Sequence, residues 1–449
     1  MGKIVLLVFI VVAAWLIRRD TAQRDGVSSA LWIPTLWLAI LTSRPLSMWL
    51  GADLTADSLE GSPVDRLFFL LMILLALITL IRRRLDWGAF AHRNWPILLF
   101  YAYFLLSVTW ADAPSASFKR LFKDFGNVLM ALVILSERNS EQALRAVFVR
   151  CAYLWMPLSV IYIRFFPAVG RVYLRSGEAE PVGVTTQKNS LGAMVLVCGI
   201  VLIWDWFERT RPTARVRTRL DRYLPFAMFV LGAYLLYLCD SKTSILCLGL
   251  SVAVLFAIRF PLLRQRVSFF GKYAIVGGCS LYLLDSLFGI SESIVSAMGR
   301  DMTFTGRTEV WKVLLGLGTN PLIGTGFCSF WSDAYYQSQL PTWIAFSAHN
   351  GYIETYIDGG WIGLGVLSVL LLTTFTRINR QLGRTGDYAL LRFSVLITVL
   401  IGNFSESHFG RINPVWLFFL IIAVEPASVR RLVTSFPRTS ARSPMFAQA

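Results

Sequence analysis

Long apolar runs separated by short polar connections recur along the whole chain. Most of them approach the length, about 20 residues, that an α-helix needs to cross the hydrocarbon core of a bilayer. The pattern therefore predicts about 12 membrane-spanning helices, or 13 if the short first and last runs both cross. The candidate spans are Ile4–Ile17, Ala30–Trp49, Leu67–Ile81, Trp95–Trp110, Phe122–Leu135, Val147–Phe165, Leu191–Phe207, Tyr223–Leu238, Ser244–Phe260, Tyr273–Ile290, Gly360–Phe375, Ala389–Ile401 and Val415–Val424.

One long polar stretch, residues 291–359, interrupts this pattern between two candidate spans. Thr305 or Thr308 can cap a short helix in it, and Ser347 can cap a second helix. That second helix would have His349 in its first turn and would loosen at a Gly-Gly pair before the next span. A helix N-terminus offers free N–H groups and positive potential to an anion. The stretch is therefore the predicted place for chemistry.

Composition places the chain among membrane proteins. Its 449 residues are 55% hydrophobic and only 16% charged, whereas soluble domains carry about 25% charged residues. The net charge of +16 would suggest nucleic acid as a partner of a soluble protein. Cytoplasmic loops of membrane proteins collect Lys and Arg, however, so no nucleic acid is expected here. The predicted fold class is all-α, a polytopic membrane protein with one large outer loop containing short helices.

Basic residues give the predicted orientation. Arg-rich connections alternate along the chain and are expected on the cytoplasmic side, together with a disordered tail at 430–449. The 291–359 loop is then outside. Lys119, Arg120 and Arg164 break the rule by lying outside, and we interpret them as side chains that reach lipid head groups. Basic residues beside polar motifs are better placed to hold an anionic ligand, because guanidinium forks match phosphate oxygens.

Four polar segments are expected on the same outer face. They are TTQKNSLG at 185–192, DSKTS at 240–244, the 291–359 loop, and NFSESHFGRINP at 403–414. Each segment alone is a weak signal. Together they form the kind of site that several helices assemble.

The motifs KNSLG, DSKTS, GRDxTxTGRTEVW, NPLIGTGF, AHNGYIE and NFSES, in this order, resemble those of the O-antigen ligase and polymerase superfamily. The resemblance is closest to the exopolysaccharide polymerase branch and covers residues 188–414. It implies a GT-C-like membrane fold, with N-terminal transmembrane helices at 1–165 and a ligase-like catalytic domain at 166–429.

The resemblance also implies an activity. It is an inverting, metal-independent glycosyl transfer, without a cofactor, at the periplasmic face of the bacterial inner membrane. The donor would be a glycan on undecaprenyl diphosphate, held in the membrane lipid, and export or flippase proteins would be further partners. The functional arginine, arginine and histidine of the ligases fall on Lys242, Arg307 and His349. Lysine at the first position departs from the family pattern.

The predicted site joins these positions to the polar residues around them. We assign His349 as the base that deprotonates the acceptor hydroxyl and Arg307 as a catalytic cation. A plain helix-capping histidine is the alternative for His349. The residues expected to hold the diphosphate are Lys242, Arg300, Lys188 and Arg411. The expected supporting residues are Glu309, Asn350, Glu354, Glu406 and His408.

Three functions compete at this point. The first is polymerisation of lipid-linked repeat units into exopolysaccharide or O-antigen. The second is a ligase that transfers finished glycan to lipid A core or to a protein. The third is a transporter of the lipid-linked glycan, which would favour repeated halves and charges in mid-span. The sequence has no obvious internal repeat, which favours an enzyme.

Overall fold

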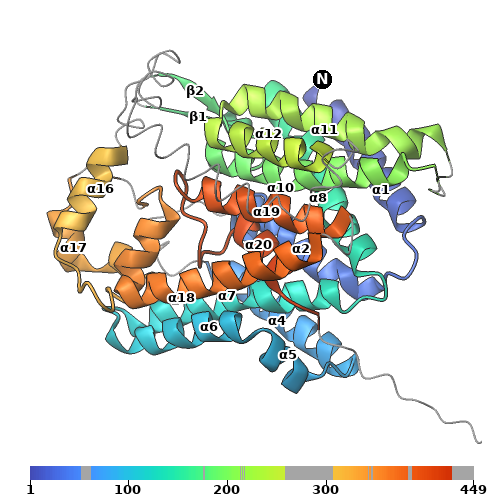
Figure 1. Ribbon diagram of the computed structural model, residues 1–449. Helices are drawn as coiled ribbons and strands as arrows, with labels where there is room; N and C mark the ends of the chain where they lie inside the picture. The colour runs from blue at the N-terminus through green and yellow to red at the C-terminus, as the bar shows by residue number, and fades with distance from the viewer. Residues whose placement is uncertain are drawn as a thin grey trace, which may run out of the picture.

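The computed structural model describes residues 1–51, 62–174, 177–212, 214, 216, 218–257, 307–341, 343–344, 347–382 and 387–426. These residues form a bundle of helices, most of which run side by side (Figure 1). The helices and strands are α1 (Gly2–Thr21), α2 (Trp32–Leu41), α3 (Leu46–Trp49), α4 (Pro63–Arg82), α5 (Trp87–Arg93), α6 (Trp95–Ser107), α7 (Pro114–Leu135), α8 (Ser140–Phe165), α9 (Pro167–Gly170), β1 (Arg171–Tyr173), β2 (Ala179–Pro181), α10 (Lys188–Arg209), α11 (Arg219–Cys239), α12 (Lys242–Ala257), α16 (Arg307–Gly316), α17 (Ala334–Gln339), α18 (Gly351–Leu382), α19 (Asp387–Gly402) and α20 (Pro414–Ala423).

The predicted all-α membrane architecture is confirmed in its main features. In the described part of the chain, five helices are long and apolar enough to cross a membrane, namely α4, α8, α10, α11 and α18. Shorter apolar helices, including α12, α19 and α20, pack beside them. The candidate span at 273–290 lies outside the described residues.

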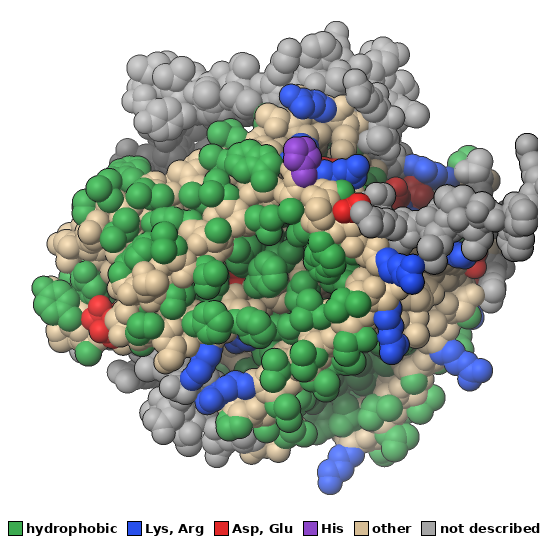
Figure 2. All heavy atoms as spheres, turned by 90° about the horizontal axis from the view of Figure 1, so that it is seen from below, with side chains coloured by type: hydrophobic (Ala, Val, Ile, Leu, Met, Phe, Trp, Pro, Cys, Tyr) green, Lys and Arg blue, Asp and Glu red, His purple; other side chains and the backbone are tan. Residues whose placement is uncertain are grey.

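The outer surface of the bundle suits lipid. Hydrophobic side chains cover much of the face seen in Figure 2, and charged side chains are sparse across its centre. On α4, for example, Leu67, Leu71, Leu74 and Ile78 are all exposed. Such an apolar surface is stable in hydrocarbon and costly in water.

The predicted span at Ala30–Trp49 is wrong in extent. α2 ends at Leu41 and is about 15 Å long, half the thickness of the hydrocarbon core. Thr42 and Ser43 direct their hydroxyls to carbonyl oxygens four residues back, at 2.6 and 2.9 Å. Pro45 follows, without an N–H group to continue the helix. Local hydrogen bonding and proline therefore stop a run that hydropathy alone would extend.

Helix α10 is the core of the bundle. Its apolar residues cover every side, and α8, α11, α12 and α20 pack around it. A helix that is hydrophobic all round must be buried in this way. Close approach of α12 depends on Gly192, where an added Cβ would lie 2.5 Å from the Oγ of Ser244. Polar partners are found at the two ends of α10.

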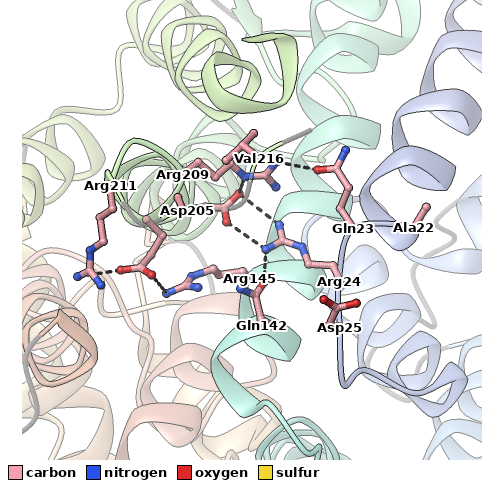
Figure 3. A pocket seen from close by; sticks show the side chains of 12 residues that line it. Ala22, Gln23, Arg24, Asp25, Gln142, Arg145, Asp205, Arg209, Arg211 and Val216 are labelled. Carbon is pink, nitrogen blue, oxygen red and sulfur yellow. Dashed lines mark hydrogen bonds and ion pairs between the residues drawn. The ribbon is translucent and has the colours of Figure 1, made fainter. Parts of the chain in front are cut away.

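The C-terminal end of α10 carries a buried ion-pair network (Figure 3). Asp205 pairs with Arg24 at 3.0 Å and with Arg209 at 2.8 Å. Asp20 of α1 pairs with Arg24 at 2.8 Å and with Arg150 of α8 at 3.4 Å. Several of these residues line a polar cavity of about 520 Å³. Because buried charges need partners, the network fixes the ends of α1, α8 and α10 to one another.

Helix α18 is two helices joined at Gly360, whose backbone has φ 60° and ψ −160°. A Cβ at this position would lie 2.2 Å from the backbone of Leu322. The N–H groups of Trp361 and Ile362 bond to the carbonyls of Pro321 and Leu322, at 2.8 and 3.1 Å. The sequence predicted this division between a short loop helix and the next span, and it is confirmed.

We expect Gly360→Ala to destabilise the folded protein by about 2 kcal/mol or more. Alanine is strained at this positive φ, and its Cβ would clash with the backbone of Leu322. The matched control is Gly365→Ala in the same helix, where an added Cβ meets nothing within 4 Å. That variant should be neutral or slightly stabilising, since alanine is the better helix former. Thermal unfolding of the purified protein measures both. Equal losses in the two variants would contradict the role of Gly360.

Candidate active site

Several polar segments meet near the N-terminal end of α10. They are the starts of α10, α12 and α16, residues 347–350 before α18, and the connection 403–413 between α19 and α20. In Figure 1, α16, α17 and the hairpin β1–β2 lie together at one end of the bundle. The structure thus brings together the four polar motifs of the sequence.

Glu406 lies at the centre of this cluster. Its Oε1 accepts a hydrogen bond from Asn189 Nδ2 at 2.8 Å and from Arg307 Nη2 at 3.2 Å. Its Oε2 lies 3.6 Å from Nδ1 of His349. Burial alone would raise the pKa of Glu406, but the adjacent His349 imidazole and nearby positive charge lower it overall. Glu406 is therefore ionised at neutral pH.

His349 has an unusual backbone conformation and a side chain that is partly buried and partly exposed. Its φ of 48° lies in the left-handed region, which few residues other than glycine adopt. The side chain is 36% exposed, yet Nδ1 is buried and faces Glu406. A carboxylate beside Nδ1 favours the tautomer with the hydrogen on that nitrogen. Nε2 is then left as the proton acceptor.

The predicted cap of the loop helix is wrong. The helix begins at Gly351, and Asn350 caps it by accepting the N–H groups of Tyr352 and Ile353 at 3.0 and 3.1 Å. Ser347 Oγ accepts the N–H of His349 instead, at 3.1 Å. The left-handed turn at His349 explains the difference, because helical geometry can start only after it. His349 thus precedes the helix rather than lying in its first turn.

A second ion pair supports the segment before His349. Arg411 Nη2 lies 2.7 Å from Glu354 and 2.9 Å from Asp358. The other oxygen of Glu354 accepts the N–H of Ala348 at 2.8 Å, and Trp331 Nε1 donates to Glu354 at 3.0 Å. Glu354 is buried, so its ion pair with Arg411 is needed to keep its carboxylate ionised. Two carboxylates therefore occupy the guanidinium of Arg411, which we had expected to hold diphosphate.

The two candidate lysines lie at the margin of the cluster. Lys242 begins α12 and pairs with Asp240 at 2.5 Å, and Lys188 begins α10 and pairs with Glu180. Both side chains are more than 40% exposed, so these surface pairs are weak and can open for an anion. The turn between α11 and α12 reaches the cluster through Thr243, which bonds to Ser405 at 2.7 Å.

The other predicted residues have different surroundings. Glu309 is exposed in the first turn of α16. His408 bonds through its backbone N–H to Asn403 at 2.9 Å, and burial lowers the pKa of its imidazole to about 4. His408 is therefore neutral at physiological pH. Arg300 lies outside the described residues.

Sequence reasoning missed two asparagines. Asn189 bonds directly to Glu406, although we had singled out only the lysine beside it. Asn403 is fully buried, accepts the N–H groups of His408 and Phe409, and gives its carbonyl to Gly351. Polar residues at the ends of otherwise apolar helices were the available signal.

The chain is similar in sequence to membrane-associated proteins that are named for surface polysaccharides. The O-antigen ligase family model matches residues 227–368, which include Lys242, Arg307 and His349. The exopolysaccharide production protein ExoQ of Rhizobium meliloti (strain 1021) is 24% identical over 353 residues, which cover 73% of this chain and 75% of that protein. The resemblance stated from the motifs is thereby confirmed. Glu406 lies beyond the residues that the family model matches.

We expect Arg411→Ala to destabilise the protein by about 3 kcal/mol or more, because it removes the cation that pairs with two buried carboxylates. Arg307→Ala is the comparison. It removes the one ion pair that Arg307 makes among the described residues, whose two side chains are 19% and 15% exposed, and should cost about 1 kcal/mol. Thermal unfolding at neutral pH measures both. A larger loss for Arg307→Ala would reverse the structural roles of the two arginines.

Proposed function

We propose that this protein is an inner-membrane glycosyltransferase that polymerises undecaprenyl-diphosphate-linked repeat units into exopolysaccharide or O-antigen. The supporting observation is the cluster of Arg307, His349 and Glu406 at one end of an apolar helix bundle. The cluster combines a base and a cation next to a membrane-facing surface, as transfer from a lipid carrier requires. The site would face the periplasm.

The mechanism begins with the acceptor sugar. Its hydroxyl would donate a hydrogen bond to Nε2 of His349, which takes the proton as the oxygen attacks the anomeric carbon of the donor. Glu406 would stabilise the imidazolium that forms, since its carboxylate faces Nδ1. Attack from the side opposite the diphosphate would invert the anomeric configuration.

The leaving group is the second requirement. As the glycosidic oxygen departs with the diphosphate, negative charge develops that cations must stabilise. Arg307 would supply this charge, because a guanidinium has five N–H donors and only one contacts Glu406 in the described residues. Lys242, Lys188 and Arg300 would bind the outer phosphate oxygens. Charge-assisted hydrogen bonds of this kind are about twice as strong as neutral ones.

A ligase that transfers finished glycan to lipid A core or to a protein is the second candidate function. The name of the matching family favours it, whereas the name of the matching relative favours exopolysaccharide production. The relative spans 73% of the chain and the family model spans only residues 227–368. We therefore place the polymerase first.

The catalytic prediction concerns His349 and Glu406. His349→Asn should lower transfer by about 10²–10⁴-fold, since an amide can hydrogen-bond the acceptor but cannot take its proton. Asparagine tolerates left-handed backbone, so the fold should be kept. Glu406→Gln should cost about 10–100-fold, the loss typical of a residue that orients another. Transfer is measured with purified protein and lipid-linked repeat units.

The control for this series is His408→Asn, which changes a neutral histidine outside the Glu406–His349 contact and should lose less. Normal thermal stability of each variant shows that the loss is chemical. Transfer by His349→Asn at close to the wild-type rate would remove His349 from the mechanism.

The cellular prediction separates the two candidate functions. Deletion should leave single lipid-linked repeat units and no high-molecular-weight glycan, because no enzyme then joins them. Extraction of lipid-linked glycans followed by gel analysis measures this. Long polymer that accumulates on undecaprenyl diphosphate would identify a ligase instead.

A further inference from the structure

A cationic cavity lies beside the candidate active site, on α7. Its volume is about 330 Å³, and Arg120, Lys123 and Arg411 are among the residues that line it. Arg411 also bonds to Glu354, whose other oxygen holds the N–H of Ala348, directly before His349. The cavity and the candidate active site therefore share one wall and remain two separate sites.

The charged side chains that line this cavity differ in whether they have partners. Arg411 is paired with two carboxylates, as described above. Arg120 donates to the carbonyl of Cys328 and to Ser332 Oγ, rather than extending to lipid head groups as the sequence suggested. Asp124 also lines the cavity, but Tyr101, Trp416 and Asn127 saturate its carboxylate with hydrogen bonds at 2.8 to 3.1 Å.

Lys123 is the cation that remains. Within the described ranges, no carboxylate lies in ion-pair distance of its ammonium and no hydrogen bond reaches it; its Nζ lies 4.9 Å from the ring centre of Phe69. The carboxylates of Asp65 and Asp124 attract this ammonium only from beyond ion-pair distance. A half-buried ammonium without a direct ion pair is costly, and an anionic ligand in the cavity would relieve that cost. Phe118 and Phe122, on the same helix, are exposed as lipid-facing residues are.

We propose that this cavity binds the phosphate headgroup of a lipid, and that in the polymerase it holds the diphosphate of the acceptor. This assignment rests on the proposed function. Polymerisation joins two lipid-linked glycans, so the enzyme needs a second headgroup site besides the one at Arg307. A repeat unit that starts at the Lys123 cavity would extend its far sugar around the wall formed by Arg411 and Glu354 to reach His349.

The binding test uses undecaprenyl diphosphate without a glycan as the probe, counted by native mass spectrometry on full-length protein in detergent. Wild type should bind two molecules. Lys123→Gln should bind one, with the second weakened about tenfold or more, the loss expected of a charge-assisted hydrogen bond. Lys123→Arg should keep two, and Lys119→Gln, on the same helix outside the cavity lining, should be unaffected.

Two results would overturn the site. In the first, a stably folded Lys123→Gln variant binds two molecules with unchanged affinity. In the second, Lys119→Gln loses as much binding of the second molecule as Lys123→Gln does. If Lys123→Gln does not fold, Lys123→Arg tests the same point, because loss of the second molecule despite a retained charge would also refute it. Arg307→Ala should instead weaken the binding of the other undecaprenyl diphosphate molecule.

A competition experiment separates a substrate site from a general lipid site. If the cavity is specific for a diphosphate, phosphatidylglycerol at equal concentration should not displace the undecaprenyl diphosphate whose binding depends on Lys123. Displacement would confirm a phosphate headgroup site and overturn its role for the acceptor.

Steady-state transfer gives the second readout. Lys123→Gln should raise KM for the acceptor about tenfold while KM for the donor stays unchanged. If deletion shows a ligase and the Lys123-dependent binding persists, the polymerase proposal fails while the headgroup site stands. If the polymerase is confirmed and acceptor KM does not move, only the cavity proposal fails.

Discussion

The cost of burying charge in a nonpolar environment organises this protein. Helix α10 carries apolar residues between its ends, with Asn189 at one end and Asp205 at the other. At 1.5 Å per residue these two lie about 24 Å apart. The polar residues of α10 form networks at its two ends, because a lone charge between them would find no partner. One network ties α1, α8 and α10 together, and the other assembles the candidate active site.

The two carboxylates near His349, Glu354 and Glu406, have different roles. Glu354 is buried, paired with Arg411, and holds the backbone before His349, so it fixes where the histidine lies. Glu406 is less buried and faces the imidazole, so it acts on the chemistry of the side chain. A strained left-handed residue persists only where its neighbours hold it in place, and functional sites are where such residues gather.

Hydropathy alone predicted most helices, because the membrane requires long apolar runs. The alternation of basic connections predicted which polar segments lie on the same face. Hydropathy failed at Thr42 and Pro45, where local hydrogen bonds and a missing N–H end a helix inside an apolar run. Residue type could not show that Arg411 is paired with two carboxylates, since its partners lie 53 and 57 residues away in the chain. Asn189 was missed for the same reason, as Glu406 is 217 residues distant.

The break at Gly360 also sets the depth of the candidate site. Residues 361–382 form a helix about 33 Å long, which matches the hydrocarbon thickness of about 30 Å. Trp361 opens that helix and is 63% exposed, as tryptophans at a membrane boundary are. The short helix before Gly360 adds at most about 14 Å beyond this boundary. The start of this short helix, directly after His349 and Asn350, therefore lies close to the membrane boundary marked by Trp361. In the proposed reaction, a sugar on a lipid diphosphate would then reach His349 without its carrier leaving the bilayer.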